Sequence, residues 1–263
     1  IYLTGGLSAA ATWGNMIIYL RYSDDSGATW SKPEIILPDH ANGQILPINI
    51  VFRGATGSIL LPCDDGAKSA TVLLESKDNG ANWRLTDGRI DGIHAAVAPL
   101  SDGRMLAFGR RKSDDPRPMP RSISDDRGAN WTVTDSPFDA VSGGQRPVML
   151  RLGEGPLVLF SFTKGMEVTD QSGKPFHARG LFAAVSYDDG VTWPVRRLMT
   201  DDGPGRDLEG GAWTGRFFMS KTHAEPRGYL TATQGANGLI HLLTSRNHYS
   251  FNLKWLETPA MGD

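Results

Sequence analysis

A histidine, an arginine and a tyrosine occupy corresponding places in three segments of this 263-residue sequence. Each segment is an apolar strand, a glycine-containing turn and a second apolar strand, and His94, Arg146 and Tyr229 mark the starts of the first strands. The ends of the second strands carry Arg110, Lys164 and Arg246. If the segments surround a common axis, these six side chains converge in a cationic pit.

Such a pit is suited to proton transfer or nucleophilic attack on an anionic substrate. Cationic neighbours stabilise a phenolate, so Tyr229 can act as a nucleophile or as a base. A histidine titrates near neutrality when unperturbed, which makes His94 the candidate proton partner. The structural alternatives are that His94 and Tyr229 only fill strand starts, and that the arginines only cover the sheets with their stems.

The elements that would position these residues are indicated by an eight-residue pattern, S-x-D-x-G-x-[TN]-W, which occurs four times. Its copies are Ser23–Trp30, Ser76–Trp83, Ser124–Trp131 and Ser186–Trp193. The aspartate can accept backbone N–H bonds across a turn, the glycine supplies a positive φ, and the tryptophan buries its ring between neighbouring units. The pattern therefore predicts a structural turn that carries no chemistry itself.

Strand–turn–strand units alternate with these turns, and a third and a fourth strand flank each turn. Four antiparallel strands repeated about every 50 residues are typical of a β-propeller. The 31 glycines and 16 prolines fit frequent turns and oppose a helical bundle. We expect an all-β propeller of about six blades, about five of them visible here, with residues 1–263 as a single domain. The first unit lacks its innermost strand, so we expect one or more strands to precede Ile1.

The repeated turns are of the kind called Asp boxes or BNR repeats, and nearly the whole chain resembles the sialidase (neuraminidase) superfamily. The resemblance implies a site at the narrow end of a central funnel. There an arginine triad binds the carboxylate of sialic acid, a tyrosine activated by a glutamate is the nucleophile, and an aspartate is the acid/base. Asp boxes also occur in other propellers, so they specify the fold better than the activity.

The match to that site is partial. Tyr229 corresponds to the nucleophile, nine residues before the turn glycine Gly238. The glutamate position holds His94, and the position of the acid/base aspartate falls near Thr12, within a stretch (residues 4–20) that has no carboxylate. The sequence therefore departs from an ordinary sialidase at both of these positions.

Two of the three arginines of the triad have candidate counterparts in this sequence. Arg117 and Arg179 each lie seven residues before the serine of an Asp box, and Arg179 resembles the third arginine of the triad. Arg121 competes with Arg117 for its position. The first triad arginine would lie on the strand expected before Ile1. Two arginines directed into one funnel suggest a carboxylated ligand, because the guanidinium binds a carboxylate bidentately.

Further polar residues surround the last unit and the end of one strand. His223 and Glu225 are two residues apart, so in a strand they share one face, where they could contact a sugar at the rim or form a weak metal site. Glu225 is also the carboxylate nearest to Tyr229 in sequence, which makes it a candidate acid. His248–Tyr249 forms a second polar cluster. Asp64–Asp65 is either a rim turn or a substitute carboxylate for a glycosidase pair.

The amino-acid composition limits the classes of partner that the protein can bind. A net charge of −2 gives no long-range attraction for nucleic acid or an anionic membrane, and no stretch approaches the ~20 apolar residues of a membrane span. A single cysteine, Cys63, excludes an intrachain disulfide and a cysteine-based zinc cluster. We expect no metal, no cofactor and a carbohydrate partner, a sialylated or uronate-containing glycan. The sequence does not fix the cellular compartment, and we favour a secreted or periplasmic location over the cytoplasm.

Three functions remain open. The first is a sialidase-like glycoside hydrolase of the exo-sialidase type, acting on an acidic sugar. The second is a polysaccharide lyase that uses His94, Tyr229 and arginines on a uronic acid. The third is a propeller that binds glycans without catalysis. Paired carboxylates in the funnel would favour the hydrolase. A His–Tyr–Arg cluster without paired carboxylates would favour the lyase, and a funnel filled by side chains would favour the non-catalytic propeller.

Overall fold

The repeated strands and turns form a nearly all-β molecule. The computed structural model describes the chain except for residues 9–15, 38–44, 112–116, 212 and 262–263. In the described part it has 24 strands and one short helix, α1 (Leu253–Glu257). No described helix has the length and apolar character needed to cross a membrane.

The first two blades are built from the first 91 residues. The first blade is the antiparallel sheet β1–β2–β3, with bounds Tyr2–Ser8, Met16–Tyr22 and Glu34–Ile36. The second blade is the sheet β4–β6–β7–β8, in which β5 also pairs with β6 and β9 with β7. Its strands β4 to β9 are Ile45–Pro47, Phe52–Arg53, Ile59–Asp65, Ala70–Ser76, Arg84–Leu85 and Ile90–Asp91.

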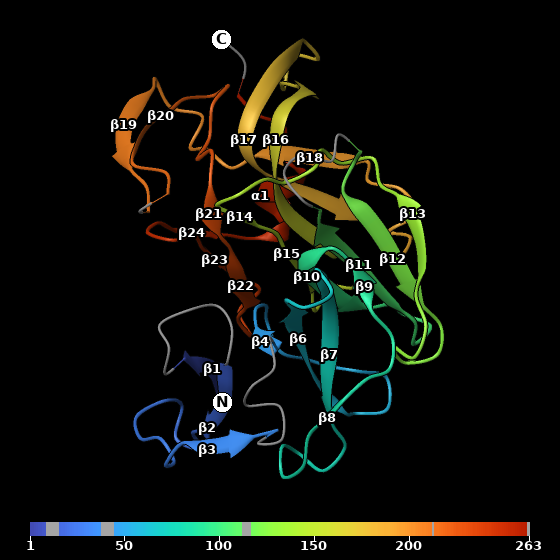
Figure 1. The fold of residues 1–263 in the computed structure, drawn as a ribbon. Helices are drawn as coiled ribbons and strands as arrows, with labels where there is room; N and C mark the ends of the chain where they lie inside the picture. The colour runs from blue at the N-terminus through green and yellow to red at the C-terminus, as the bar shows by residue number, and fades with distance from the viewer. Residues whose placement is uncertain (9–15, 38–44, 112–116, 212, 262–263) are drawn as a thin grey trace.

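The next two blades are four-stranded antiparallel meanders. In the third blade, β10 to β13 are Ile93–Pro99, Met105–Arg110, Pro120–Ser124 and Thr132–Asp135. In the fourth blade, β15 to β18 are Val148–Arg151, Leu157–Thr169, Pro175–Ser186 and Val195–Leu198. The long β16–β17 hairpin projects beyond its blade (Figure 1).

The last blade is the three-stranded sheet β22–β23–β24, with bounds Thr231–Gln234, Ile240–Leu243 and His248–Phe251. A separate hairpin, β19 (Arg206–Glu209) and β20 (Arg216–Met219), comes before it. Just ahead of the inner strands of the last two blades, β14 (Gln145–Arg146) pairs in parallel with β21 (Gly228–Tyr229). This pairing joins two blades close to their inner strands.

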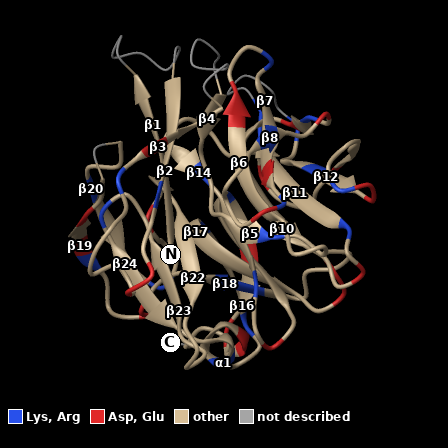
Figure 2. Ribbon diagram, turned by 90° about the horizontal axis from the view of Figure 1, so that it is seen from below, with Lys and Arg blue, Asp and Glu red and all other residues tan. Residues whose placement is uncertain are grey.

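The five sheets are arranged as the blades of a propeller ring (Figure 1). Along the ring, β10 packs against β6 on one side and β15 on the other, and β15 packs against β22. Basic and acidic residues are intermingled over the ribbon (Figure 2), as the small net charge implies. The predicted all-β propeller with about five visible blades is therefore confirmed.

The four Asp boxes share one hydrogen-bonded geometry. In the third box, Ser124 Oγ donates to Asp126, Gly128 N donates to Ser124 Oγ, and Asn130 donates through its backbone and side-chain nitrogens to Asp126, all within 2.7–2.9 Å. The other three boxes repeat these bonds. The structure adds a feature that the pattern did not predict, since the residue before each box glycine also has a positive φ, between 57° and 61° at Ser26, Asn79, Arg127 and Asp189.

The hydrophobic core lies between the blades. One buried cluster joins the first and second blades, another the second and third, and the largest joins the third, fourth and last. Trp83 packs on the first cluster and Trp131 on the second, while Trp193 packs edge-on against Phe108 and Phe138 in the third. The tryptophans of the last three boxes thus lie between units as predicted, and Trp193 is the most deeply buried of the four.

Candidate functional site

His94 is held in an unusual backbone conformation at the start of β10. Its φ is 58°, in the left-handed region that residues other than glycine seldom adopt, and the β10–β11 register shifts between Ile93 and Ala96. The carboxylate of Asp64, on β6, accepts the His94 backbone N–H at 2.6 Å and bonds the ring Nδ1 at 2.5 Å. One carboxylate therefore holds both the bulged backbone and the imidazole, and strain of this kind is concentrated at functional sites.

The orientation of the imidazole determines what Tyr229 contacts. Because Nδ1 faces a carboxylate, it carries the ring proton and leaves Nε2 as an acceptor. The Tyr229 hydroxyl lies 3.2 Å from Nε2, and the two rings meet edge-on with centroids 5.3 Å apart. The hydroxyl therefore donates to His94, which donates to Asp64. These three residues, named here the relay, form a continuous hydrogen-bonded chain.

Two arginines surround the relay. Arg146 is paired with Tyr229 in the parallel β14–β21 ladder, and its Cζ lies 5.1 Å from the centroid of the tyrosine ring. Its Nη2 donates to the Leu230 carbonyl at 3.0 Å. Arg110, at the end of β11, donates to the Gln145 carbonyl at 3.1 Å. Backbone carbonyls thus hold both guanidinium groups, Arg146 over the ring of Tyr229 and Arg110 close enough to His94 to influence its charge.

The electrostatics favour a neutral imidazole. The pKa of His94 is lowered, and burial of the ring is the largest cause. The hydrogen bond and the charge of Asp64 act in the opposite direction and raise the pKa, whereas the charges of Arg110 and Arg146 lower it further. Near pH 7 the ring is therefore unprotonated at Nε2 and can accept a proton from Tyr229. Arg146, whose guanidinium lies over the tyrosine ring, is the positive charge next to the group that would give up this proton.

Asn49 ties the starts of three blades together. Its side-chain amide donates to the carbonyls of Ala95 and Pro147, each at 3.0 Å, and these residues directly follow His94 and Arg146. Sequence reasoning missed Asn49. By the nine-residue spacing to the turn glycine, Ile48 rather than Asn49 corresponds to His94 and Tyr229, so the repeat gave no signal for Asn49.

The structure brings four of the predicted residues together: His94, Tyr229, Arg146 and Arg110. Asp64, left open between a rim turn and a substitute carboxylate, is the partner of His94. Its neighbour Asp65 instead forms an ion pair with Arg89 at 2.9 Å. Asp64 lies towards the end of a second strand, as Arg110 does, and that correspondence was the signal for it.

Glu225 lies close to Tyr229 in sequence, yet its carboxylate is directed elsewhere. The side chain is completely buried and accepts hydrogen bonds from Thr244, Asn247 and Tyr249, each at 3.1 Å, and burial raises its pKa. These contacts do not support the expected role as an acid acting on Tyr229. Glu225 instead anchors the turn 244–247, whose Ser245 accepts the Tyr229 backbone N–H at 3.0 Å.

The remaining predicted residues are not members of the relay. Arg179 and His223 are neighbours through a parallel bridge, and both are exposed. Arg246 is exposed on the turn that holds Tyr229, Lys164 is exposed in the β16–β17 hairpin, and Arg117 is exposed ahead of β12. Thr12 lies outside the described residues. Among those residues no group of three or more His, Cys, Asp or Glu could hold a metal ion.

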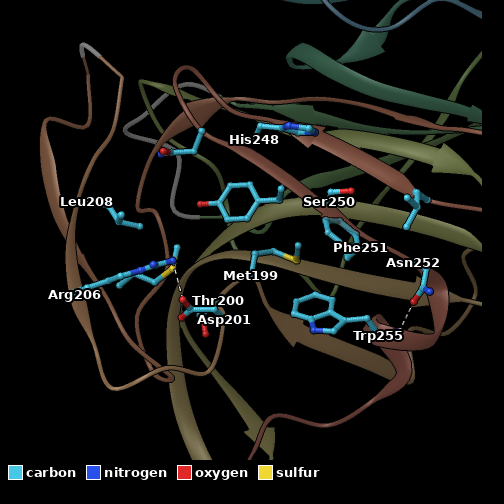
Figure 3. Close-up of a pocket in the computed structure, with 14 residues that line it drawn as sticks. Met199, Thr200, Asp201, Arg206, Leu208, His248, Ser250, Phe251, Asn252 and Trp255 are labelled. Carbon is cyan, nitrogen blue, oxygen red and sulfur yellow. Dashed lines mark hydrogen bonds and ion pairs between the residues drawn. The ribbon is translucent and has the colours of Figure 1, made fainter.

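A cavity of about 620 Å³ lies away from the relay. It is bounded by the end of β18, the β19–β20 hairpin, β24 and α1 (Figure 3). Arg206 and Asp201 form an ion pair of 2.7 Å in its wall, and Tyr249 and Trp255 also line it. None of the relay residues lines this cavity, so the candidate site is the cluster at the inner strand starts, where Tyr229 and Arg146 are partly exposed.

Comparison with solved structures places this geometry on a known fold. The intramolecular trans-sialidase from Ruminococcus gnavus superposes with a TM-score of 0.61 at 16% identity, over 93% of this chain and 52% of that one. The Hadza microbial sialidase Hz136 superposes with a TM-score of 0.59 at 17% identity, over 95% of this chain and 46% of that one. The leech intramolecular trans-sialidase superposes with a TM-score of 0.59 at 14% identity, over 92% of this chain and 37% of that one. The chain thus spans about half of these proteins or less, and the likeness concerns the fold.

Family comparison gives the more specific result. No curated protein matches the chain. The family model described as a BNR repeat-like domain matches residues 6–242. Together with the four Asp boxes and the ring of blades, this match shows that the chain belongs to the BNR repeat-like domain family. The likeness to the solved structures confirms the predicted sialidase-like β-propeller fold.

Proposed function

We propose that the protein is a sialidase-like glycoside hydrolase acting on an acidic sugar, with Tyr229 as its nucleophile. The observation that carries the proposal is the relay itself, in which the Tyr229 hydroxyl donates to a neutral imidazole that Asp64 orients. In this reading a histidine–aspartate pair does the work that a glutamate does in the sialidases that the sequence resembles.

The first chemical step follows from the contacts. Nε2 of His94 takes the hydroxyl proton, and the phenolate oxygen attacks the anomeric carbon as the bond from that carbon to the leaving oxygen breaks. The leaving oxygen takes a proton from solvent. Arg146, whose guanidinium lies over the ring, stabilises the phenolate. Water then attacks the same carbon and releases one proton to solvent, the bond from that carbon to Tyr229 breaks, and His94 returns its proton to the tyrosine oxygen.

The charge around the relay supports an anionic sugar. Arg110 and Arg146 are both close enough to lower the pKa of His94, and a carboxylate is the group that paired guanidinium ions bind well. The similar leech protein is known in complex with 2,7-anhydro-Neu5Ac prepared by soaking with 3′-sialyllactose. That relative supports a carboxylated sugar as the class of ligand for this chain.

A second candidate is elimination on a uronic acid. It is favoured by one observation, that the described partner of the Tyr229 hydroxyl is an imidazole rather than a carboxylate. The Tyr229 phenolate would remove the C5 proton, the C4–O4 bond would break, and O4 would leave with that proton from Tyr229. A C4=C5 double bond would form and no water would be consumed. Arg146 and Arg110 would neutralise the uronate.

Mass spectrometry of products separates these reactions. The purified protein is incubated with sialyllactose and with uronate oligosaccharides, and hydrolysis yields fragments whose masses sum to the substrate plus one water. Elimination yields fragments that sum to the substrate alone, with new ultraviolet absorbance from the conjugated double bond. Absence of product from every glycan, or equal turnover by the Tyr229→Phe variant, contradicts both enzymatic readings.

A further inference from the structure

One large aromatic side chain is exposed on the hairpin that precedes Tyr229. Trp213 exposes 72% of its surface, in the turn that connects β19 to β20. A single exposed apolar side chain is common on protein surfaces, but tryptophan offers a flat apolar face together with a polar N–H. The apolar C–H face of a sugar ring is a suitable partner for such a surface.

The turn that carries Trp213 is attached to the segment leading into Tyr229. Thr214 Oγ1 donates to the Arg227 carbonyl at 2.9 Å. The Cβ of Trp213 lies 3.3 Å from the point where a Cβ on Gly144 would stand. Gly144 in turn accepts the Gly228 backbone N–H at 2.9 Å. Trp213 is therefore joined to the strand pair β14–β21 just ahead of its reactive residues.

Strand direction places Trp213 at the same end of the ring as the relay. Because β14 and β21 run in parallel, with Arg146 opposite Tyr229, the residues that precede them emerge at one rim. Gly144 and Arg227 are those preceding residues. The turn of the β19–β20 hairpin lies beside β21 in Figure 1. A ligand held at Tyr229 thus has Trp213 as its neighbour on the rim.

Arg227 adds a charge to this surface. It is exposed, and its Cδ lies 3.4 Å from the same point above Gly144, so that it flanks this glycine together with Trp213. Among the described residues its guanidinium has no ion-pair or hydrogen-bond partner. A planar aromatic ring and an uncommitted guanidinium next to each other suit a sugar ring that carries an anionic group.

We propose that Trp213 and Arg227 form a subsite for the sugar next to the one that reacts. Trp213 stacks on the ring of that sugar, and Arg227 binds its anionic group. The inference rests on the proposed function and extends it, because it assigns the substrate to acidic oligosaccharides with charge on adjacent residues. Gly144 leaves the space between the two side chains open, since a Cβ there would press on both.

Calorimetric binding in a Tyr229→Phe background tests the subsite without turnover. The probes are N-acetylneuraminic acid with its α2,8-linked dimer, and galacturonic acid with its trimer. Trp213→Ala is expected to weaken binding of the dimer or the trimer about tenfold while leaving the monosaccharide unchanged. Trp213→Phe keeps an aromatic face and is expected to retain most of the affinity.

Arg227 is tested by the charge of the second sugar. Arg227→Gln is expected to weaken binding of the α2,8-linked dimer but not of 3′-sialyllactose, whose second sugar is neutral. Arg216→Gln and Phe218→Leu are the controls, because both residues are exposed on the same hairpin. Thermal unfolding of every variant checks that the fold is retained.

The outcomes separate this inference from the proposed function. If Trp213→Ala weakens monosaccharide and oligosaccharide equally, or weakens neither, the subsite is wrong and the function of the relay stands. If no probe binds to the parent protein, both are wrong. Selective loss of oligosaccharide affinity supports both.

Discussion

At the scale of the residue, the proposed chemistry depends on the proton affinity of His94. Burial and the two arginines lower its pKa, and Asp64 raises it. These opposing influences keep Nε2 free to accept the Tyr229 proton, while the left-handed backbone and the carboxylate hold the ring in place. A histidine in this setting is a base near neutral pH rather than a fixed cation.

The acid limb of activity should therefore report His94. We expect kcat/KM to fall with decreasing pH at a midpoint below the ordinary histidine value of about 6.5. Arg146→Gln removes a charge that lowers the pKa and should move this limb to higher pH. Asp64→Asn removes the interactions that raise the pKa and should move it to lower pH. NMR titration of the His94 ring checks both shifts without substrate, and shifts in the same direction would contradict this assignment.

Loss of the Tyr229 hydroxyl should remove the reacting group and little else. Tyr229→Phe is expected to lower kcat by a factor of at least about 10³, with a smaller effect on binding. Tyr249→Phe is the matched control, because that hydroxyl bonds to Glu225 and not to the relay. Steady-state kinetics on the substrate found by mass spectrometry measures both variants, and equal losses would indicate a structural role for Tyr229.

At the scale of the element, the Asp boxes hold the blades and the β-bulge directs the site. Each box fixes a turn through one aspartate, and the tryptophans of the last three boxes pack against a neighbouring blade. The bulge at His94 interrupts the β10–β11 register, and the buried side chain of His94 contacts Asp64 and Tyr229. The repeated elements join the blades, whereas the irregular one forms part of the candidate site.

The tryptophans should differ in their contribution to stability although they occupy the same box position. Trp193 is 7% exposed and packs against Phe108 and Phe138, so Trp193→Ala should cost about 3–5 kcal/mol of unfolding free energy. Trp30 is only partly buried, so Trp30→Ala should cost clearly less. Urea unfolding measures both, and equal costs would contradict the inference that the burial of the ring decides the effect.

At the scale of the whole molecule, the site exists because several blades meet at the axis. Asp64 comes from the second blade, His94 and Arg110 from the third, Arg146 precedes the inner strand of the fourth, and Tyr229 precedes that of the last. Asn49 bridges three of these blades through two backbone carbonyls. Activity should therefore be sensitive to contacts that hold blades together.

Asn49→Asp tests this dependence with little change in size. Aspartate keeps an oxygen for the Ile50 N–H but cannot donate to Ala95 and Pro147. We expect a loss of about 1–3 kcal/mol in unfolding free energy and a displaced His94 ring resonance in NMR spectra. Unchanged stability together with an unchanged resonance would show that Asn49 does not position the site.

Much of the fold was predictable from local sequence, and less of the site. The box spacing predicts the blades because each turn is satisfied by residues within eight positions of one another. The correspondence of strand starts likewise predicts that His94, Arg146 and Tyr229 converge. It does not predict which residues each side chain contacts. Glu225 is close to Tyr229 in sequence, yet its carboxylate accepts hydrogen bonds from Thr244, Asn247 and Tyr249.

The sequence by itself determined the repeated architecture and the corresponding strand starts that bring His94, Arg146 and Tyr229 together, because periodic turns and apolar strands are local properties. The tertiary structure alone decided that Asp64 orients His94 from 30 positions away, and that Trp213 stands beside Gly144. These contacts depend on strand register between blades and on one bulge. Neither has a local signature, because both result from how separately formed sheets pack around a common centre.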